Sequence, residues 1–267
     1  MPRQVVVLHS GAGIAQLRYQ NFARFLADAG IPTLTYDYRG IGASRPASLR
    51  GFGAAMEDWA EYDCAAAIGW LRGRFPASEI VGIAHSIGTL LQGAAHNAAE
   101  QAQVLMIGAH VGYYGDYRRL YRLPMAAMWH GVMPALTRLF GYFPARAVGL
   151  GEDIPRAVAL QWAGRRSADL RTRPGEKGHE RRSRLLDHCA GLGYPVRMIL
   201  ASDDAFATPA SARRLLSYYP RVRVLEQLTV TPAEAGVQRV GHFGFFRRRP
   251  GALLWPRMLA TLDTLAA

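Results

Sequence analysis

The sequence predicts an α/β fold, with a mostly parallel sheet of about six strands and helices on both faces. The first indication is an alternation of short, β-branched apolar runs with segments of helical spacing, which is typical of successive strand–helix–strand units. The second is that the apolar runs are almost continuous, as expected of strands that are covered on both faces. The length of 267 residues suits one such domain with an insertion, or two small domains.

The expected elements begin with the strand Gln4–His9, which reads Gln-Val-Val-Val-Leu-His. The helix Arg18–Ala29 follows, and Gly30 is expected to end it. The remaining expected strands are Pro32–Tyr36, Glu79–Ala84, Gln103–Gly108, Val196–Ala201 and Val222–Glu226, and the remaining expected helices are Met56–Arg72, Ile87–Ala99, Pro209–Tyr218 and Gly251–Leu265. Right-handed crossovers bring the carboxyl ends of all these strands to one edge of the sheet, where the sites of such folds lie.

Residues 111–190 interrupt this alternation. The segment is rich in aromatic residues, among them Tyr113, Trp129 and Trp162, and nothing in it alternates like a strand. We expect it to form a helical cap that is inserted into an α/β core made of residues 1–110 and 191–267.

The composition and the cysteines indicate the compartment in which we expect the protein. Half of the residues are apolar, yet no apolar run reaches the roughly 18–20 residues of a membrane span. The apolar run near the start is too short for a secretory signal peptide. Cys64 and Cys189 lie far apart in the sequence, and we expect no disulfide between them. These features predict a cytoplasmic protein without a membrane span.

The formal net charge of +12 would by itself fit a nucleic-acid or membrane-surface binder. Lys177 is, however, the only lysine among the 32 basic residues, and no basic stripe interleaved with aromatics, zinc-ligand spacing or recognition-helix pattern accompanies the arginines. We interpret the charge as a solvated, arginine-rich surface and expect no specific nucleic-acid partner.

Ser86 lies where the expected strand Glu79–Ala84 passes into the next expected helix. The small residues Ala84 and Gly88 stand two positions before and after it, which fits the tight hinge that exposes a nucleophilic serine. In such a hinge the N–H of the next residue, Ile87, lies beside the helix N-terminus and can donate to an oxyanion.

A serine nucleophile needs a base that takes its proton and an acid that orients the base. Asp203 and Asp204 follow the strand Val196–Ala201, and His242 lies in a glycine-bracketed loop after the last strand. Each group follows a strand, and the order serine, aspartate, histidine is the one found in folds that carry this hinge. The sequence therefore predicts a Ser-His-Asp triad.

With these motifs the chain resembles the α/β-hydrolase superfamily, and within it the serine-aminopeptidase-like and monoacylglycerol-lipase-like branch, which includes predicted bacterial hydrolases. The resemblance rests on the loop 36–44 (Tyr-Asp-Tyr-Arg-Gly-Ile-Gly-Ala-Ser), the hinge 84–88, and the segments 203–209 (Asp-Asp-Ala-Phe-Ala-Thr-Pro) and 241–246 (Gly-His-Phe-Gly-Phe-Phe). Parts of the expected cap, at 141–144 and 151–155, also look like that branch, so the resemblance spans almost the whole chain.

The resemblance implies the role of each triad residue. Ser86 is the expected nucleophile and His242 the expected general base. Asp204 is the preferred acid, because it stands four residues before Thr208, close to the spacing at which the superfamily's aspartate precedes a proline. Asp203 stays open as the alternative acid.

The resemblance also implies an oxyanion hole made of two backbone N–H groups. One belongs to Ile87, and the other to Gly11 or Ala12, in the loop after the first strand. The chain departs from the superfamily by opening directly on the strand that the superfamily places third, so we expect either a start codon that is called late or a sheet of about six strands that lacks the first two. One edge of the sheet would then be bare, and we expect lower solubility or a homodimer.

The expected function is that of a serine hydrolase, similar to esterases and lipases, which cleaves a carboxylic ester or related acyl bond of a small apolar or amphipathic substrate through an acyl-enzyme. We expect no cofactor. We also expect no metal, because the histidines outside the predicted site show no ligand spacing with carboxylates (His96, His110, His130, His179 and His188). We expect His85 to pack in the hinge. An acyltransferase on the same triad, and a non-catalytic binding protein with a vestigial site, stay open as alternatives.

Overall fold

The computed structural model describes residues 1–263 except 166, 172–174 and 176–177. In these residues a six-stranded sheet of entirely parallel neighbours has the order β2-β1-β3-β4-β7-β8. The strands are β1 (Gln4–His9), β2 (Thr33–Thr35), β3 (Glu79–His85), β4 (Gln101–Ile107), β7 (Pro195–Ala201) and β8 (Arg223–Val230). The predicted α/β fold with its parallel sheet of six strands is confirmed.

The central strands β1, β3 and β4 are mostly apolar because both faces of the sheet are covered there. In β1, Val5 and Val7 pack into one hydrophobic core, and Val6 and Leu8 pack into the core on the opposite face. Successive side chains of a strand point to opposite faces, so a strand that is buried on both sides carries apolar residues along most of its length. The burial of all six residues of β1 follows from this.

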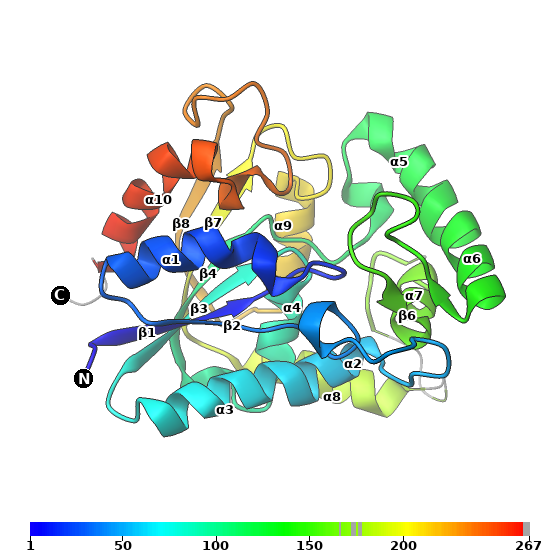
Figure 1. The fold of residues 1–267 in the computed structure, drawn as a ribbon, viewed down its shortest axis with the longest axis horizontal. Coiled ribbons are helices and arrows are strands. Elements are labelled where there is room, and N and C mark those ends of the chain that lie inside the picture. The colour runs from blue at the N-terminus through cyan, green and yellow to red at the C-terminus, as the bar shows by residue number, and fades with distance from the viewer. Residues whose placement is uncertain (166, 172–174, 176–177, 264–267) are drawn as a thin grey trace.

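Helices cover the two faces (Figure 1). α1 (Gln20–Asp28) and α10 (Arg248–Asp263) lie together on one face, and α3 (Ala65–Arg74), α4 (Gly88–Leu91), α8 (His179–Gly191) and α9 (Pro209–Leu216) contribute to the core of the other. α2 (Met56–Asp58) continues through a π-helical turn at Trp59–Cys64 into α3. Leu265, the expected end of the last helix, lies outside the described residues. In the described part of the chain, no helix combines the length and the apolar character that crossing a membrane requires.

The segment expected to form the cap is mostly helical. α5 (Arg119–Ala127), α6 (Met133–Phe140) and α7 (Arg156–Ala163) stand to one side of the sheet in Figure 1. β5 (Tyr142–Phe143) and β6 (Ile154–Pro155) pair there as a short antiparallel ribbon that the sequence did not predict, since two-residue strands leave no alternation to detect. α8 packs instead beside α2 and the 3-10 turn Gln92–Ala94 of the core.

The helix expected at Ile87–Ala99 is much shorter in the structure. α4 ends at Leu91 and passes into the 3-10 turn Gln92–Ala94. The hydroxyl of Tyr219 donates to the carbonyl oxygens of Thr89 (2.7 Å) and Leu90 (3.2 Å), which a continuing α-helix would use as backbone acceptors. A residue from 130 positions away therefore ends the helix.

Trp59 should contribute strongly to stability. Its side chain is fully buried, stacks on Tyr38 at a centroid distance of 4.9 Å, and donates from Nε1 to the carbonyl oxygen of Arg39. We expect Trp59→Ala to lower the free energy of unfolding by about 3–5 kcal/mol, because it leaves a cavity and an unpaired carbonyl. Trp70→Ala is the matched control, since the Trp70 side chain is 56% exposed, and it should cost no more than about 0.5 kcal/mol. Denaturant unfolding measures both, and equal losses would contradict this account.

Candidate active site

Ser86 forms the turn between β3 and α4. It is the only described non-glycine residue with a positive φ, at 58°, a conformation that L-residues seldom adopt outside constrained sites. Gly88 permits the turn, because a Cβ at that position would lie 2.5 Å from the carbonyl oxygen of Ser10 and 2.7 Å from that of His9. The hinge therefore packs directly against the end of β1, as its small residues suggested.

His242 and Asp204 meet Ser86 at the same edge of the sheet. Nε2 of His242 lies 3.0 Å from the Ser86 hydroxyl oxygen, and Nδ1 lies 2.7 Å from Oδ2 of Asp204. The backbone N–H groups of Phe206 and Ala207 donate to the other carboxylate oxygen of Asp204. Burial alone would raise the pKa of Asp204, but the attraction of His242 and these hydrogen bonds outweigh it, so the pKa is lowered and the carboxylate stays ionised.

The neighbouring Asp203 points elsewhere. Its two oxygens accept hydrogen bonds from the backbone N–H groups of Val240 (3.0 Å) and Gly241 (2.9 Å). Asp203 thus holds the backbone of the loop that carries His242, whereas Asp204 contacts the imidazole itself. Of the two carboxylates considered for the acid, Asp204 is the one in hydrogen-bonding contact with the imidazole.

A second chain of hydrogen bonds connects the loop after β1 with the loop that carries His242. The Gly11 N–H donates to the hydroxyl of Tyr19 (3.1 Å), which lies 2.9 Å from Nδ1 of His85. Nε2 of His85 lies 2.9 Å from the carbonyl oxygen of His242, which can only accept, so this nitrogen carries the proton. Burial, and then the proximity of His242, lower the pKa of His85 well below its usual range. His85 is therefore a neutral structural link.

These hydrogen bonds bear on which residue after β1 supplies the second N–H of the expected oxyanion hole. Because the Gly11 N–H already donates to Tyr19, Ala12 is the better candidate of the two residues predicted after β1. Among the described residues, nothing accepts a hydrogen bond from the N–H of Ala12 or from that of Ile87. Ile87 directly precedes the first turn of α4, where N–H groups have no partner within the helix.

His110 is a site residue that the sequence analysis missed. It follows β4 by three residues and is almost fully buried, and its Nε2 lies 2.8 Å from the Ser86 hydroxyl oxygen. The backbone N–H of Gly112 donates to its Nδ1 at 2.9 Å. Burial, followed by the proximity of His242, lowers the pKa of His110 to about 3, so the ring is neutral. The signal that selected Asp204 and His242, a polar group just after a parallel strand, would also have selected His110.

Among the described residues, neither His9 nor a group of metal ligands forms a second centre of this kind. His9 is buried between Tyr36 (2.7 Å) and Gln101 (3.2 Å), and burial lowers its pKa to about 4. In the part of the chain that the structure describes, no three side chains of His, Cys, Asp or Glu are arranged to hold a metal ion.

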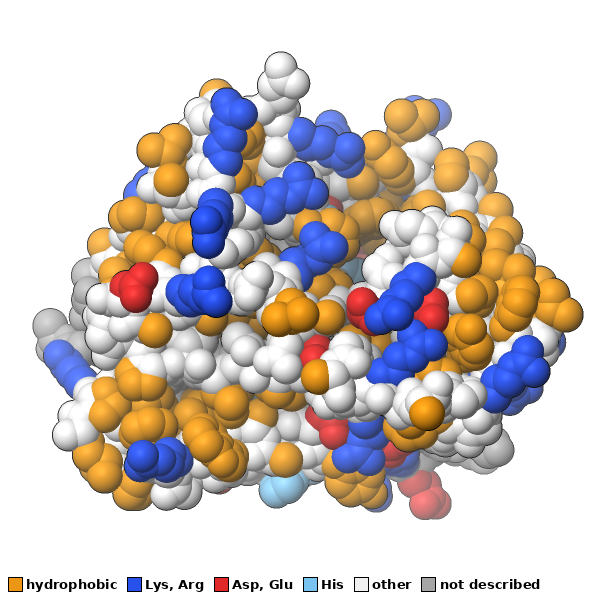
Figure 2. Space-filling view, viewed as in Figure 1, with side chains coloured by type: hydrophobic (Ala, Val, Ile, Leu, Met, Phe, Trp, Pro, Cys, Tyr) orange, Lys and Arg blue, Asp and Glu red, His pale blue; other side chains and the backbone are white. Residues whose placement is uncertain are grey.

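Ser86 opens into a cavity of about 820 Å³ between the core and the cap segment. The cavity is walled on the cap side by Trp129, Leu150 and Trp162, and on the core side by the loop after β1 and the segment around Phe243. Figure 2 shows the hollow between the two parts, with hydrophobic side chains within it and several Lys or Arg side chains along its upper left border. The described lining includes Arg18, Arg247 and Arg248.

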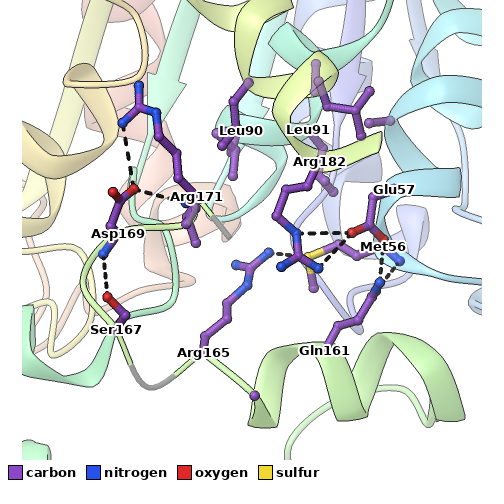
Figure 3. Close-up of a pocket in the computed structure, with 16 residues that line it drawn as sticks. Met56, Glu57, Leu90, Leu91, Gln161, Arg165, Ser167, Asp169, Arg171 and Arg182 are labelled. Carbon is purple, nitrogen blue, oxygen red and sulfur yellow. Dashed lines mark hydrogen bonds and ion pairs between the residues drawn. The ribbon is translucent and has the colours of Figure 1, made fainter. Parts of the chain in front are cut away.

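A second cavity, of about 510 Å³, lies beside α4, α7 and α8 (Figure 3). Ion pairs line it, with Arg182 on Glu57 at 3.1 Å and Arg171 on Asp169 at 3.7 Å, and Arg165 lies between them in this view. Its described lining contains no histidine or cysteine. The cavity at Ser86, where Ser86, His242 and Asp204 meet, is therefore the candidate active site.

Three solved structures illustrate the likeness of this fold to known enzymes. One of the metagenome-derived lipolytic enzymes LipS and LipT has a TM-score of 0.61 at 18% identity, over 98% of this chain and 94% of that one. An esterase of Pyrococcus furiosus has a TM-score of 0.57 at 15% identity, with 97% and 81% covered. The monoacylglycerol lipase of Paleococcus ferrophilus has a TM-score of 0.51 at 15% identity, with 85% and 84% covered.

At these identities the structural likeness shows the fold. No curated protein matches the sequence significantly. The family model described as "Serine aminopeptidase, S33" matches residues 1–226, which is most of the chain. With the parallel sheet and the serine hinge already described, this match shows that the chain belongs to the serine aminopeptidase S33 family of α/β hydrolases.

Proposed function

We propose that the protein is a serine hydrolase that cleaves carboxylic esters through an acyl-enzyme formed on Ser86. The observation that carries this proposal is the contact of one buried imidazole, His242, with both Ser86 (3.0 Å) and Asp204 (2.7 Å) at the floor of a cavity. These are the contacts that a nucleophile, its base and the orienting acid require. The lipolytic and esterase structures that share this fold support an ester substrate.

In the first half of the reaction the Ser86 oxygen attacks the ester carbonyl carbon. Its proton passes to Nε2 of His242, which becomes an imidazolium stabilised by Asp204. The N–H groups of Ile87 and Ala12 donate to the carbonyl oxygen as it becomes an oxyanion. The tetrahedral intermediate collapses, the bond to the leaving alcohol breaks, and His242 returns its proton to the alcohol oxygen.

In the second half a water molecule attacks the acyl-enzyme. One water proton passes to His242 as the oxygen bonds to the acyl carbon. The bond between this carbon and the Ser86 oxygen then breaks, and the serine oxygen takes the proton from His242. The products are a carboxylic acid and free enzyme.

The cavity supports an apolar acyl chain in a substrate that also carries a negative charge. Aromatic and aliphatic side chains dominate the walls near Ser86, among them Trp129, Trp162 and Phe206. Arg18, Arg247 and Arg248 also line the cavity, and none of them forms an ion pair with a described carboxylate. Cations that are not paired with a carboxylate attract anionic substrates at low ionic strength.

The first test is covalent labelling by a fluorophosphonate. We expect the wild type to be labelled on Ser86 and to hydrolyse p-nitrophenyl esters, because the hinge exposes an activated hydroxyl. Ser86→Ala should remove the label and lower kcat by several orders of magnitude. A folded wild type that takes no label would refute the proposed function. Product analysis with added alcohols separates hydrolysis from transfer of the acyl group to an alcohol.

The second test separates the two aspartates. We expect Asp204→Asn to lower kcat by about 10⁴-fold, because an amide cannot hold His242 in the right tautomer or stabilise the imidazolium. Asp203→Asn keeps an acceptor for the loop N–H groups and should lower kcat by about tenfold or less. The two variants are adjacent in the chain and matched in chemistry. Similar losses of kcat in two folded variants would contradict the assignment of the acid.

The third test concerns the charge of the substrate. At low salt we expect kcat/KM for an ester with an anionic leaving group to exceed that for a neutral analogue of similar size, and the difference to shrink as salt is added. Arg247→Gln should reduce the preference. Arg249→Gln is the control, since Arg249 is exposed nearby but does not line the cavity. Equal turnover of both esters at every salt concentration would exclude a role for these arginines.

A further inference from the structure

The proton positions around Ser86 follow from the hydrogen bonds of two histidines. The Gly112 N–H donates to Nδ1 of His110, so the proton of this neutral ring must lie on Nε2, 2.8 Å from the Ser86 oxygen. On the other side, Nδ1 of His242 donates to the ionised Asp204, which leaves Nε2 of His242 as an acceptor. The Ser86 hydroxyl therefore accepts from His110 and donates to His242.

We propose that His110 donates a hydrogen bond to the reacting oxygen of Ser86. This bond stabilises negative charge on the oxygen both when it attacks the substrate and when it leaves the acyl group. The inference deepens the proposed function and rests on it. His110 keeps its proton throughout. Its N–H acts on the nucleophilic oxygen, whereas the expected oxyanion hole acts on the carbonyl oxygen of the substrate.

The hydrogen bond from His110 first orients the hydroxyl of Ser86. A serine hydroxyl has one proton and two lone pairs. With one lone pair held by His110 and the proton directed to His242, the remaining lone pair is free to attack. The donor also lowers the energy of the charge that develops on the oxygen as its proton moves to His242.

The same contact acts when the acyl-enzyme breaks down. The Ser86 oxygen is then the leaving group: it takes the electron pair of the breaking C–O bond and a proton from His242. An N–H within hydrogen-bonding distance stabilises this oxygen until the proton arrives. Acylation and deacylation should therefore both slow when the donor is removed.

His110 is excluded as an alternative base by its own partners. Nε2 already carries a proton, and Nδ1 accepts from Gly112 and faces away from the serine. The surroundings also oppose a positive charge on the ring, since His242 and Arg165 both act against it and only Asp204 favours it. The ring is therefore suited to donating a hydrogen bond without transferring the proton.

Two substitutions of His110 by amide side chains of different length test the proposal. His110→Gln can place an amide N–H where Nε2 was, whereas His110→Asn can replace the acceptor Nδ1 but leaves no donor near Ser86. We expect His110→Asn to lower kcat for p-nitrophenyl acetate, and the rate of fluorophosphonate labelling, by about 10- to 100-fold with KM almost unchanged. His110→Gln should restore most of both rates.

The control is His130→Asn, which alters another partly buried histidine whose Nδ1 donates to the carbonyl oxygen of Ala163, away from Ser86. It should leave both rates unchanged. Melting temperatures of all variants identify loss of fold. If His110→Asn does not fold, the ratio of labelling rates of His110→Gln and the wild type still tests the donor, since a packing role predicts a large fall and donation predicts a small one.

The outcomes are distinct. A fall in both rates for His110→Asn that His110→Gln restores supports the proposal. Wild-type rates in folded His110→Asn, or equal falls in both variants, would overturn it and leave His110 a packing residue. Failure of the proposed function gives a different result, because the wild type itself would then take no label.

Discussion

The turn at Ser86 is the constraint on which the rest of the site depends. A residue with φ of 58° directly after a buried strand is costly, and it persists only where its surroundings fix it. Here the carbonyls of His9 and Ser10 approach so closely that only glycine fits at position 88. The turn, the end of β1 and the start of α4 thus hold one another, and the hydroxyl projects from the sheet edge where the other strands also end.

Three histidine rings lie close together at this edge, and their environments determine which of them can carry charge. The rings of His85 and His110 lie 4.8 and 5.3 Å from that of His242, measured between centroids. Repulsion prevents neighbouring rings from being protonated together. Burial holds His85 and His110 neutral, whereas His242 contacts the Asp204 carboxylate. In the proposed reaction, His242 is therefore the ring of the three that takes up the positive charge.

Much of the fold could be predicted because strands buried on both faces leave a strong trace in the sequence. The expected bounds of β1 agree with the structure, and the hinge at Ser86 follows from the small residues around it. The end of α4 could not be predicted, because it depends on the hydroxyl of Tyr219 from another element. Local propensity carries no information about such a partner.

The candidate site, like the fold, could be predicted from the sequence only in part. The order of Ser86, Asp204 and His242 along the chain predicted which groups would meet, because each follows a parallel strand. The sequence left the choice between Asp203 and Asp204 open, since both follow the same strand and only the loop conformation separates them. Whether the segment 111–190 acts as a cap, and whether the protein dimerises through its sheet edge, stay predictions.

The loop that carries Asp203 and Asp204 contacts both the backbone next to His242 and the imidazole of His242. Asp203 accepts hydrogen bonds from the backbone N–H groups of Val240 and Gly241, and Asp204 accepts one from the imidazole of His242. An insertion or deletion of one residue between Ala201 and Ala205 would keep an aspartate near the histidine but break this correspondence. The length of this loop therefore determines whether Asp204 reaches the ring while Asp203 holds the backbone beside it.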